Sequence, residues 1–204
     1  NAYRGSLVQE WLPALDGVEA RLRQGITVAD VGCDHGHSTV LMAEAYPESR
    51  FRGFDVHPGS IDAAWEAADE AGVADRVDFA IADAQGYDGA PYDLICFFDC
   101  LHDMGDPVGA ASHAARALAD DGTVMLIEPF ANDRVEDNLG PVGRLYYSAS
   151  TTLCCAHSLS EDVGLALGAQ AGESRLAEVF ATAGFSHFRR AAETPFNLIL
   201  EARR

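Results

Sequence analysis

The sequence contains no lysine, and its 14 basic residues are all arginine against 32 acidic residues, which gives a net charge of −18 over 204 residues. A protein that binds nucleic acid needs basic side chains against the phosphate backbone, usually gathered in one patch. The arginines do not cluster along this chain. We therefore expect no contact with nucleic acid from this domain.

The chain also lacks an apolar run of the roughly 18 residues that a membrane-spanning helix needs, and no signal peptide is evident. We expect no membrane contact and a cytoplasmic location. Apolar residues make up 48% of the sequence and charged residues 23%, which is ordinary for a globular protein. The length fits one domain that spans residues 1–204.

Disulfide and metal patterns are missing as well. The five cysteines are odd in number, and no pair has the spacing of a zinc ribbon or a thioredoxin-like motif. Cys154 and Cys155 are adjacent, so a redox or metal role is one interpretation; we favour two small residues that fill a buried helix face. His35 and His37 have no acidic or cysteine partner at ligand spacing. We expect thiols in a reducing compartment and no metal site.

Short apolar strands alternate with helices, which is the pattern of a doubly wound parallel α/β sheet. One helix is expected from Pro58 to Gly72, with proline in its first turn and glycine at its end. Another should begin after the N-cap Asp106 and reach Ala119, stopped by Gly122. The expected strands are one that begins at residue 28, one that ends at residue 55, and residues 77–81, 92–98, 123–128, 185–191 and 196–202.

The first strand runs into a turn that contains Gly32 and Gly36, and a helix begins near Ser38. Glycine lets a backbone turn sharply and approach a ligand closely, and the free N–H groups of the helix start point toward that turn. Asp55, at the end of the next strand, could accept hydrogen bonds from two ribose hydroxyls. Together these features predict a nucleoside-binding turn.

The glycine spacing excludes a dinucleotide. The fingerprint Gly-x-Gly-x-x-Gly would place its second and third glycines at positions 34 and 37, where this chain has Asp34 and His37. Side chains there would obstruct the approach of a pyrophosphate, and the carboxylate would repel it.

The pattern Asp30-x-Gly32-x-x-x-Gly36 instead resembles the first motif of class I S-adenosylmethionine-dependent methyltransferases. The family usually has glycine where Asp34 stands, although aspartate tolerates left-handed backbone better than most residues. The turn Ala82-Asp83-Ala84 is similar to the adenine-binding turn of the family. The cofactor-binding residues that this resemblance implies are Asp30, Gly32, Cys33, Asp34, Gly36, Asp55, Val56, Asp83, Ala84, Phe98 and Asp99.

The same resemblance implies S-adenosyl-L-methionine as the cofactor, with Asp30 under its methionine end, and S-adenosyl-L-homocysteine as the product. It also implies a Rossmann-like, doubly wound sheet of seven strands. Most of these strands should be parallel, with one antiparallel strand near the C-terminus.

The chemical candidate is His102, in the run Leu-His-Asp-Met that follows the fourth strand. This run resembles the Leu-His-Asp-Trp motif of small-molecule O-methyltransferases, in which the histidine is the general base; Met104 replaces the tryptophan here. In that family an acidic residue ends the fifth strand, and Glu128 occupies that place. The resemblance implies that Glu128 orients the imidazole of His102 while the enzyme methylates a hydroxyl of a small molecule.

Two alternatives remain open from the sequence. An N- or C-methyltransferase would need no general base at His102 if its nucleophile were a neutral amine or a stabilised carbanion. A domain that binds S-adenosylmethionine without catalysis, as part of a regulator, is the second. Neither the acceptor nor its reacting atom can be read from the residues.

Residues 130–172 are too long for an ordinary connection between a strand and a helix. They follow the fifth strand, whose C-terminal end faces the ligand crevice in open α/β sheets. We expect a cap over the substrate, including Phe130, Tyr146 and Leu153; a helical hairpin packed on the sheet edge or on another subunit is the alternative.

The opening segment from Tyr3 to Gln24 is predicted as one helix, with Leu7, Trp11 and Leu15 on one face. The sequence suggests no partner for this face.

The run from Phe97 to Pro107 and the segment from Glu136 to Gly143 resemble actinobacterial methyltransferases of unassigned substrate. This resemblance implies an N-terminal winged-helix dimerisation domain, with this chain as the catalytic half. We therefore expect that upstream sequence is missing and that the native protein is a homodimer through it.

Overall fold

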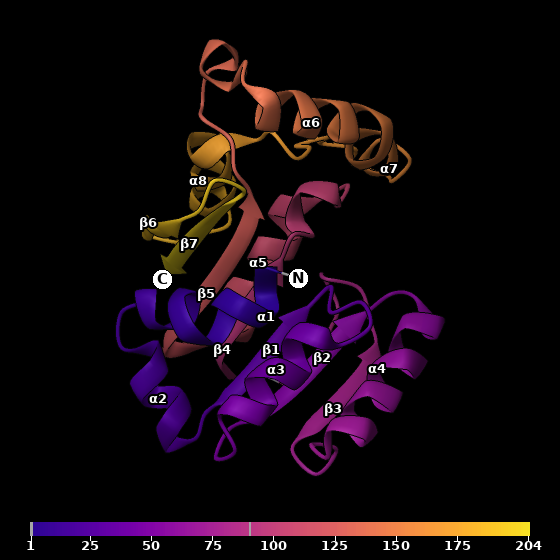
Figure 1. Cartoon of the computed structure of the whole chain (residues 1–204), viewed down its shortest axis with the longest axis vertical. Coiled ribbons are helices and arrows are strands. Elements are labelled where there is room, and N and C mark those ends of the chain that lie inside the picture. The colour runs from indigo at the N-terminus through magenta and orange to yellow at the C-terminus, as the bar shows by residue number, and fades with distance from the viewer. Residues whose placement is uncertain (1, 90) are drawn as a thin grey trace.

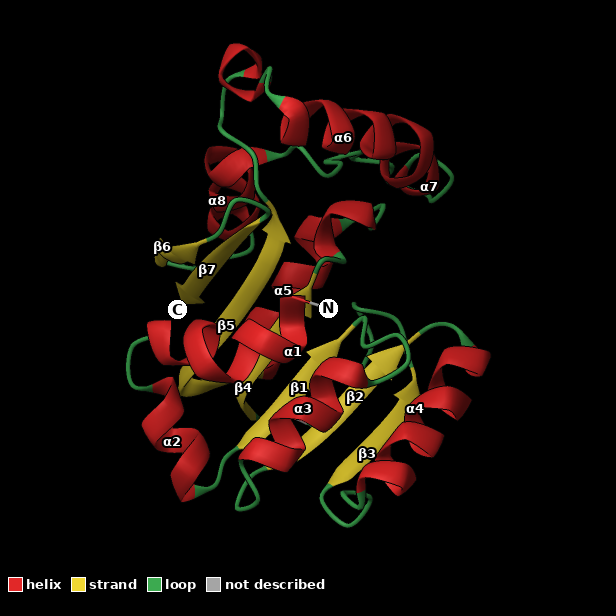
Figure 2. Cartoon of the chain, viewed as in Figure 1, coloured by secondary structure: helices red, strands yellow, loops and turns green. Residues whose placement is uncertain are grey.

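A computed structural model of the chain describes residues 2–89 and 91–204, and within them seven strands form one sheet in the order β3-β2-β1-β4-β5-β7-β6 (Figures 1 and 2). Strands β1 to β5 are parallel, and β7 is antiparallel to both of its neighbours, β5 and β6. This confirms the predicted fold class. The strands are β1 (Thr27–Val31), β2 (Arg50–Asp55), β3 (Val77–Ile81), β4 (Tyr92–Phe98), β5 (Leu118–Pro129), β6 (His187–Glu193) and β7 (Asn197–Arg203).

Helices cover both faces of the sheet, and each face has its own hydrophobic core (Figure 2). Successive side chains of a strand point to opposite faces. In β5, Met125 therefore belongs to one core and Leu126 to the other. The first core is covered by α1 (Ala2–Ser6), α2 (Val18–Gln24), α3 (His37–Ala45) and α4 (Pro58–Ala71), and the second by α5 (Pro107–Ala117) and α8 (Gly172–Thr182).

The helix signals of the sequence are partly confirmed. Helix α4 begins at Pro58, and Gly72 follows it with a left-handed φ of 69°. The Asp106 carboxylate caps α5 by accepting from the backbone N–H of Gly109 at 2.8 Å. The end of α5 at Ala119 and the strand start at Thr123 are wrong, because Leu118 already pairs with Tyr92 of β4. Pairing within the sheet overrides the local glycine signal there.

The prediction of one continuous opening helix is also wrong. Helix α1 passes into a π-helical turn over Leu7–Trp11 and a 3₁₀ turn over Leu12–Ala14, and α2 begins only after Gly17, whose φ is 72°. Leu7 and Trp11 are buried in the first hydrophobic core, with exposed fractions of 0% and 1%. This face packs on the chain's own core. It therefore gives no support to the predicted dimer, which stays a prediction.

Residues 130–172 lie across the carboxyl end of β5 (Figure 1). They form a 3₁₀ turn over Val135–Asn138, helix α6 (Pro141–Ala149), a π-helical turn over Ser150–Cys154 and helix α7 (Cys155–Ser158), followed by an irregular return to α8. We call this segment the cap. No helix in the described part of the chain combines the length and apolar character needed to cross a bilayer.

Because Trp11 is buried in the core, replacing it should destabilise this chain even when no other sequence is present. We expect Trp11→Ala to lower the free energy of unfolding by about 3–5 kcal/mol, the range for large aromatic side chains in cores. Urea denaturation followed by circular dichroism measures this change. Gln9→Ala, in the same turn but exposed, is the control and should change stability by less than about 0.5 kcal/mol. Equal stability of both variants would contradict the burial of Trp11.

Candidate functional site

The turn after β1 has the backbone that its sequence predicts. Gly32 has a φ of 75°, and a Cβ there would lie 2.8 Å from the Sγ of Cys100. Gly36 has a φ of 70° and lies at the N-terminus of α3. Asp34 also has a positive φ, of 46°, a conformation that aspartate adopts more readily than most residues. The two glycines are therefore required by backbone conformation and by close approach.

Asp55 joins the turns after β1 and β2. Its two carboxylate oxygens accept the backbone N–H groups of Asp34 at 3.0 Å and His57 at 2.9 Å. Each carboxylate oxygen has a second lone pair, so the group can still accept from a ligand. Asp83, in the turn after β3, accepts the N–H of Gln85 at 2.8 Å through Oδ1.

Asp30 lies beneath the first turn and is fully buried. One of its oxygens accepts the hydroxyls of Ser38 and Thr39, both at 2.6 Å. Burial raises the pKa of Asp30 to about 6 against the opposing effect of these hydroxyls. This carboxylate therefore holds the start of α3 in place from below.

Two neighbouring cavities open at the carboxyl end of the sheet, and Gly32 lines both. Of the eleven predicted cofactor residues, nine line one of these cavities, whereas Asp30 and Gly36 line neither. The first cavity is lined by Asp55, Val56, Asp83 and Ala84, and the second by Cys33, Asp34, Phe98 and Asp99. The described residues that line them include several carboxylates and no arginine. The site is therefore strongly acidic and suits a cationic ligand.

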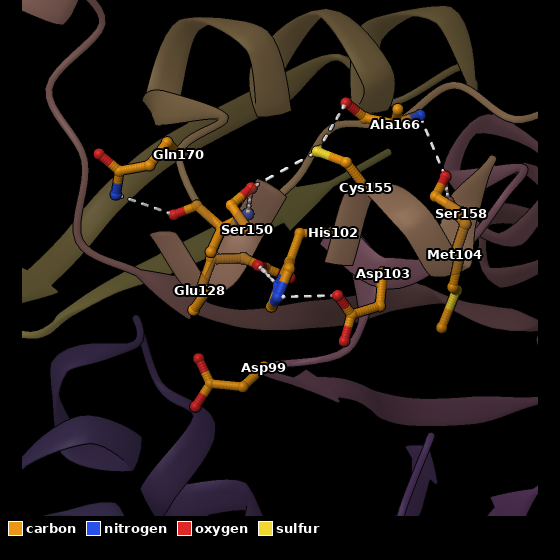
Figure 3. Close-up of polar contacts among 12 residues, drawn as sticks. Asp99, His102, Asp103, Met104, Glu128, Ser150, Cys155, Ser158, Ala166 and Gln170 are labelled. Atoms are coloured by element: carbon orange, nitrogen blue, oxygen red, sulfur yellow. Dashed lines mark hydrogen bonds and ion pairs between the residues drawn. The ribbon is translucent and has the colours of Figure 1, made fainter. Parts of the chain in front are cut away.

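His102 and Glu128, which the sequence proposes as partners, are in contact (Figure 3). His102 lies in a short 3₁₀ turn after β4, Glu128 lies near the end of β5, and both are buried. The imidazole Nδ1 forms a short hydrogen bond with the Glu128 carboxylate, and Nε2 lies 3.2 Å from Oδ1 of Asp103. Burial alone favours a neutral imidazole, but the carboxylates of Glu128, Asp103 and Asp99 raise the pKa of His102 to about 9.

Neither His102 nor Glu128 lines either of these two cavities, whereas Asp103 lines the first one. Asp103 therefore lies between the imidazole and the first cavity, and Figure 3 shows its carboxylate in contact with the ring. Asp103 is not among the predicted site residues, although it directly follows His102 in the motif. The Asp103 side chain covers Nε2 on this side and is itself 42% exposed.

Asp99 has partners that no local pattern could reveal. The hydroxyl of Tyr3 donates to its Oδ2 at 2.6 Å, and the amide of Asn197 donates to its Oδ1 at 3.3 Å. Burial raises the pKa of Asp99 to about 6, although the Tyr3 hydroxyl opposes this shift. The φ of Asp99 is 52°. Tyr3 also lines the second cavity, so the opening segment takes part in the site.

The cap is tied to the turn that carries His102. The backbone N–H of Gly168 donates to the carbonyl of His102 at 3.1 Å, and the Ser158 hydroxyl donates to the carbonyl of Met104 at 2.8 Å. Glu161 accepts the N–H of Gly105 at 2.7 Å. His157 and Glu161 line the first cavity from the cap side. The cap therefore borders the cavity as well as the sheet edge.

The two adjacent cysteines have different surroundings. Cys154 is buried, as expected, and burial together with the neighbouring Asp103 carboxylate raises the pKa of its thiol to about 12. Cys155 is only half-buried, and its Sγ lies 3.5 Å from the Ser150 hydroxyl and 3.9 Å from the carbonyl of Ala166 (Figure 3). The prediction that both fill a buried helix face is therefore right for Cys154 alone.

Comparison with known proteins gives several relatives. Over 107 residues the chain is 33% identical to 27-O-demethylrifamycin SV methyltransferase of Amycolatopsis mediterranei. The aligned residues make up 52% of this chain and 39% of that protein. Over 74 residues the chain is 40% identical to trans-aconitate 2-methyltransferase of Streptomyces avermitilis. This alignment covers 36% of this chain and 28% of the relative. The chain thus spans well under half the length of these curated relatives.

Among solved structures, mitomycin 7-O-methyltransferase MmcR superposes on 100% of this chain with a TM-score of 0.74 and 19% identity, and the match covers 53% of that chain. This likeness concerns the fold. A family model described as a methyltransferase domain matches residues 3–165, which include both cavities' turns and most of the cap. The chain therefore belongs to the methyltransferase domain family.

Proposed function

We propose that this protein transfers the methyl group of S-adenosylmethionine to a hydroxyl oxygen of a small molecule. The observation that carries this proposal is the buried contact between His102 and Glu128 beside the first cavity. A hydroxyl must lose its proton as it attacks, and a histidine placed at the acceptor can take it. The names of two relatives, 27-O-demethylrifamycin SV methyltransferase and mitomycin 7-O-methyltransferase, describe O-methylation of small molecules and support the choice of acceptor.

The residues around the two cavities fit the cofactor. Gly32 lines both cavities, and a Cβ there would lie 2.8 Å from the Sγ of Cys100, so this turn requires glycine where a ligand would pass. Asp55 would accept the ribose hydroxyls, and Asp83, with the N–H of Ala84, would bind the adenine edge. The second cavity, with Asp99 and the turn at Cys33 and Asp34, would hold the methionine end. The bound cofactor supplies an activated methyl group on a cationic sulfonium, which the surrounding carboxylates favour.

The proton route uses the chain's own side chains. Glu128 holds the proton of His102 on Nδ1 and thereby leaves Nε2 to accept a proton from the acceptor. When the acceptor enters, Asp103 turns away from Nε2. The buried carboxylate of Glu128 then stabilises the imidazolium that forms. In this role Glu128 positions and stabilises the base and does not itself take the proton.

The cap is proposed to cover the acceptor. Its residues His157 and Glu161 line the same cavity as Asp103 and Met104. A molecule that reaches Nε2 of His102 therefore has cap residues on one side and the carboxyl edge of the sheet on the other. Such enclosure would exclude water from the reacting atoms.

The assignment of Asp55 predicts a loss of cofactor affinity. Asp55→Ala should weaken binding of S-adenosylmethionine by about 1.5–3 kcal/mol, the range for hydrogen bonds to a charged group. Calorimetry measures the dissociation constant, and circular dichroism shows whether the turns that Asp55 joins are intact. Asp62→Ala, on the exposed side of α4, should bind as the unchanged protein does. An unaltered dissociation constant in Asp55→Ala would remove Asp55 from the site.

The base assignment predicts a large effect on turnover. His102→Ala should lower kcat on a hydroxyl acceptor by about 10² to 10⁴, the usual contribution of general-base catalysis. Binding of S-adenosylmethionine should change by less than about twofold, because its proposed contacts lie on other turns. His187→Ala, an exposed histidine on β6, is the control. Full turnover in His102→Ala would favour an amine or carbanion acceptor instead, and no turnover of any acceptor by the unchanged protein would favour a regulatory domain.

The role of Glu128 predicts a shift in pH dependence. Because its carboxylate favours the imidazolium, Glu128→Gln should lower the pKa of His102 from about 9. The rise of kcat/KM with pH reports that pKa and should therefore move to lower pH, while maximal turnover falls less than in His102→Ala. The pH profile of kcat/KM for both proteins, with one acceptor, measures the shift. An unshifted profile would mean that Glu128 does not act on the base.

A further inference from the structure

Three potential metal ligands of different chemistry meet where the cap touches the His102 turn. One ligand atom each from His102, Asp103 and Cys154 lies within 4.8 Å of the other two. His102 and Cys154 are buried, whereas Asp103 is half-buried and lines the first cavity. Cys154 comes from the cap, 52 positions after His102 (154 minus 102), so no ligand spacing in the sequence could have revealed this group.

The imidazole is held as metal-binding histidines usually are. Its Nδ1 contacts a buried carboxylate, that of Glu128, and this second contact fixes the ring and leaves Nε2 for a metal (Figure 3). Nε2 lies 3.2 Å from Oδ1 of Asp103. Nitrogen and oxygen ligands of a tetrahedral zinc ion, each about 2.0–2.1 Å from it, lie roughly 3.3 Å apart. The observed separation therefore already has the value that such a site requires.

Asp103 carries an unexplained feature that a cation would resolve. Its Oδ1 is buried and has no hydrogen bond, and its contact with Nε2 of His102 at 3.2 Å is an ion pair only when the imidazole is protonated. Beside a neutral imidazole this oxygen has no partner, which is destabilising, and a metal between this oxygen, the imidazole and the Cys154 thiolate would satisfy it.

We propose that His102, Asp103 and Cys154 bind a zinc ion and that this ion blocks methyl transfer. Imidazole with thiolate selects zinc-class metals over magnesium or calcium, which prefer oxygen ligands alone. One thiolate and one carboxylate balance the charge of Zn²⁺. Three protein ligands leave a fourth position, and because Asp103 lines the first cavity this position faces the space where the acceptor would lie.

Inhibition follows from the shared nitrogen and rests on the proposed function of His102. When the metal occupies Nε2, the lone pair that would accept the acceptor's proton is used. Binding of the metal releases one proton from the thiol of Cys154, which becomes a thiolate. If His102 is protonated beforehand, a second proton leaves its Nε2, because the metal binds the neutral imidazole. The ion would also link the cap to the turn after β4, because Cys154 and His102 lie in different segments.

Metal binding can be tested without any acceptor. Protein stripped with a chelator is titrated with Co²⁺, whose thiolate complex gives a charge-transfer band, and with Zn²⁺ in competition with a chromophoric chelator. We expect one ion per chain. Cys154→Ser should lower zinc affinity by more than about 100-fold, and Glu128→Gln by about 10- to 100-fold, the usual effect of losing a partner behind a histidine ligand.

The neighbouring cysteine offers a matched control. Cys155→Ser removes a thiol one position away that has other contacts, with Ser150 and Ala166, and should bind zinc and give the cobalt band as the unchanged protein does. Circular dichroism of each variant shows whether it folds. The absence of a cobalt–thiolate band in the unchanged protein would overturn the proposal, and so would equal zinc affinity in Cys154→Ser and the unchanged protein.

The inhibitory part has its own measurement. Zinc should lower turnover of the unchanged protein and of Cys155→Ser, each relative to its own metal-free rate, and a chelator should restore it. Activation by zinc, or inhibition that is undiminished in Cys154→Ser, would overturn this part. If no hydroxyl acceptor is turned over at all, the proposed function fails while the cobalt and zinc titrations still decide the metal site.

Discussion

The constraint on which this site depends is the alignment of parallel strands at their carboxyl ends. The hydrogen-bond ladder continues beyond the strands into the turns: the N–H groups of Gly32 and Cys33 both donate to the carbonyl of Phe54, and that of Asp99 donates to Ile127. These bonds fix each turn to the strand beside it. Motifs that are far apart in sequence therefore line two adjoining cavities, and Glu128, which follows Ile127, reaches His102.

A second property of the site is how it holds carboxylates without arginine or lysine beside them. Asp55 accepts backbone N–H groups, Asp30 accepts two hydroxyls, and Asp99 accepts a phenol and an amide. These donors are neutral and leave the charge of the carboxylates uncompensated, in keeping with the pKa values of about 6 for Asp30 and Asp99. Such a site favours a cation, and the sulfonium cofactor of the family is one.

The cap and the His102 turn form one hydrogen-bonded unit. Gly168, Ser158 and Glu161 of the cap all bond to the backbone of residues 102–105. These bonds hold the cap against the sheet edge, although its side chains Leu145 and Leu153 are largely exposed.

Local patterns in the sequence were enough to predict the fold class and the backbone of the turns after β1 and β2. Strand periodicity, the glycines with positive φ at positions 32 and 36 and the acidic residue that ends β2 are each readable over a few residues. The sequence also predicted that His102 and Glu128 lie at the ends of neighbouring strands. Three contacts became evident in the folded chain alone: Trp11 is buried in the chain's own core, Tyr3 bonds to Asp99, and Cys154 lies beside Asp103. Each of these contacts joins residues that are tens of positions apart in the sequence. Packing in three dimensions determines which residues meet, and local periodicity and spacing carry no information about that packing.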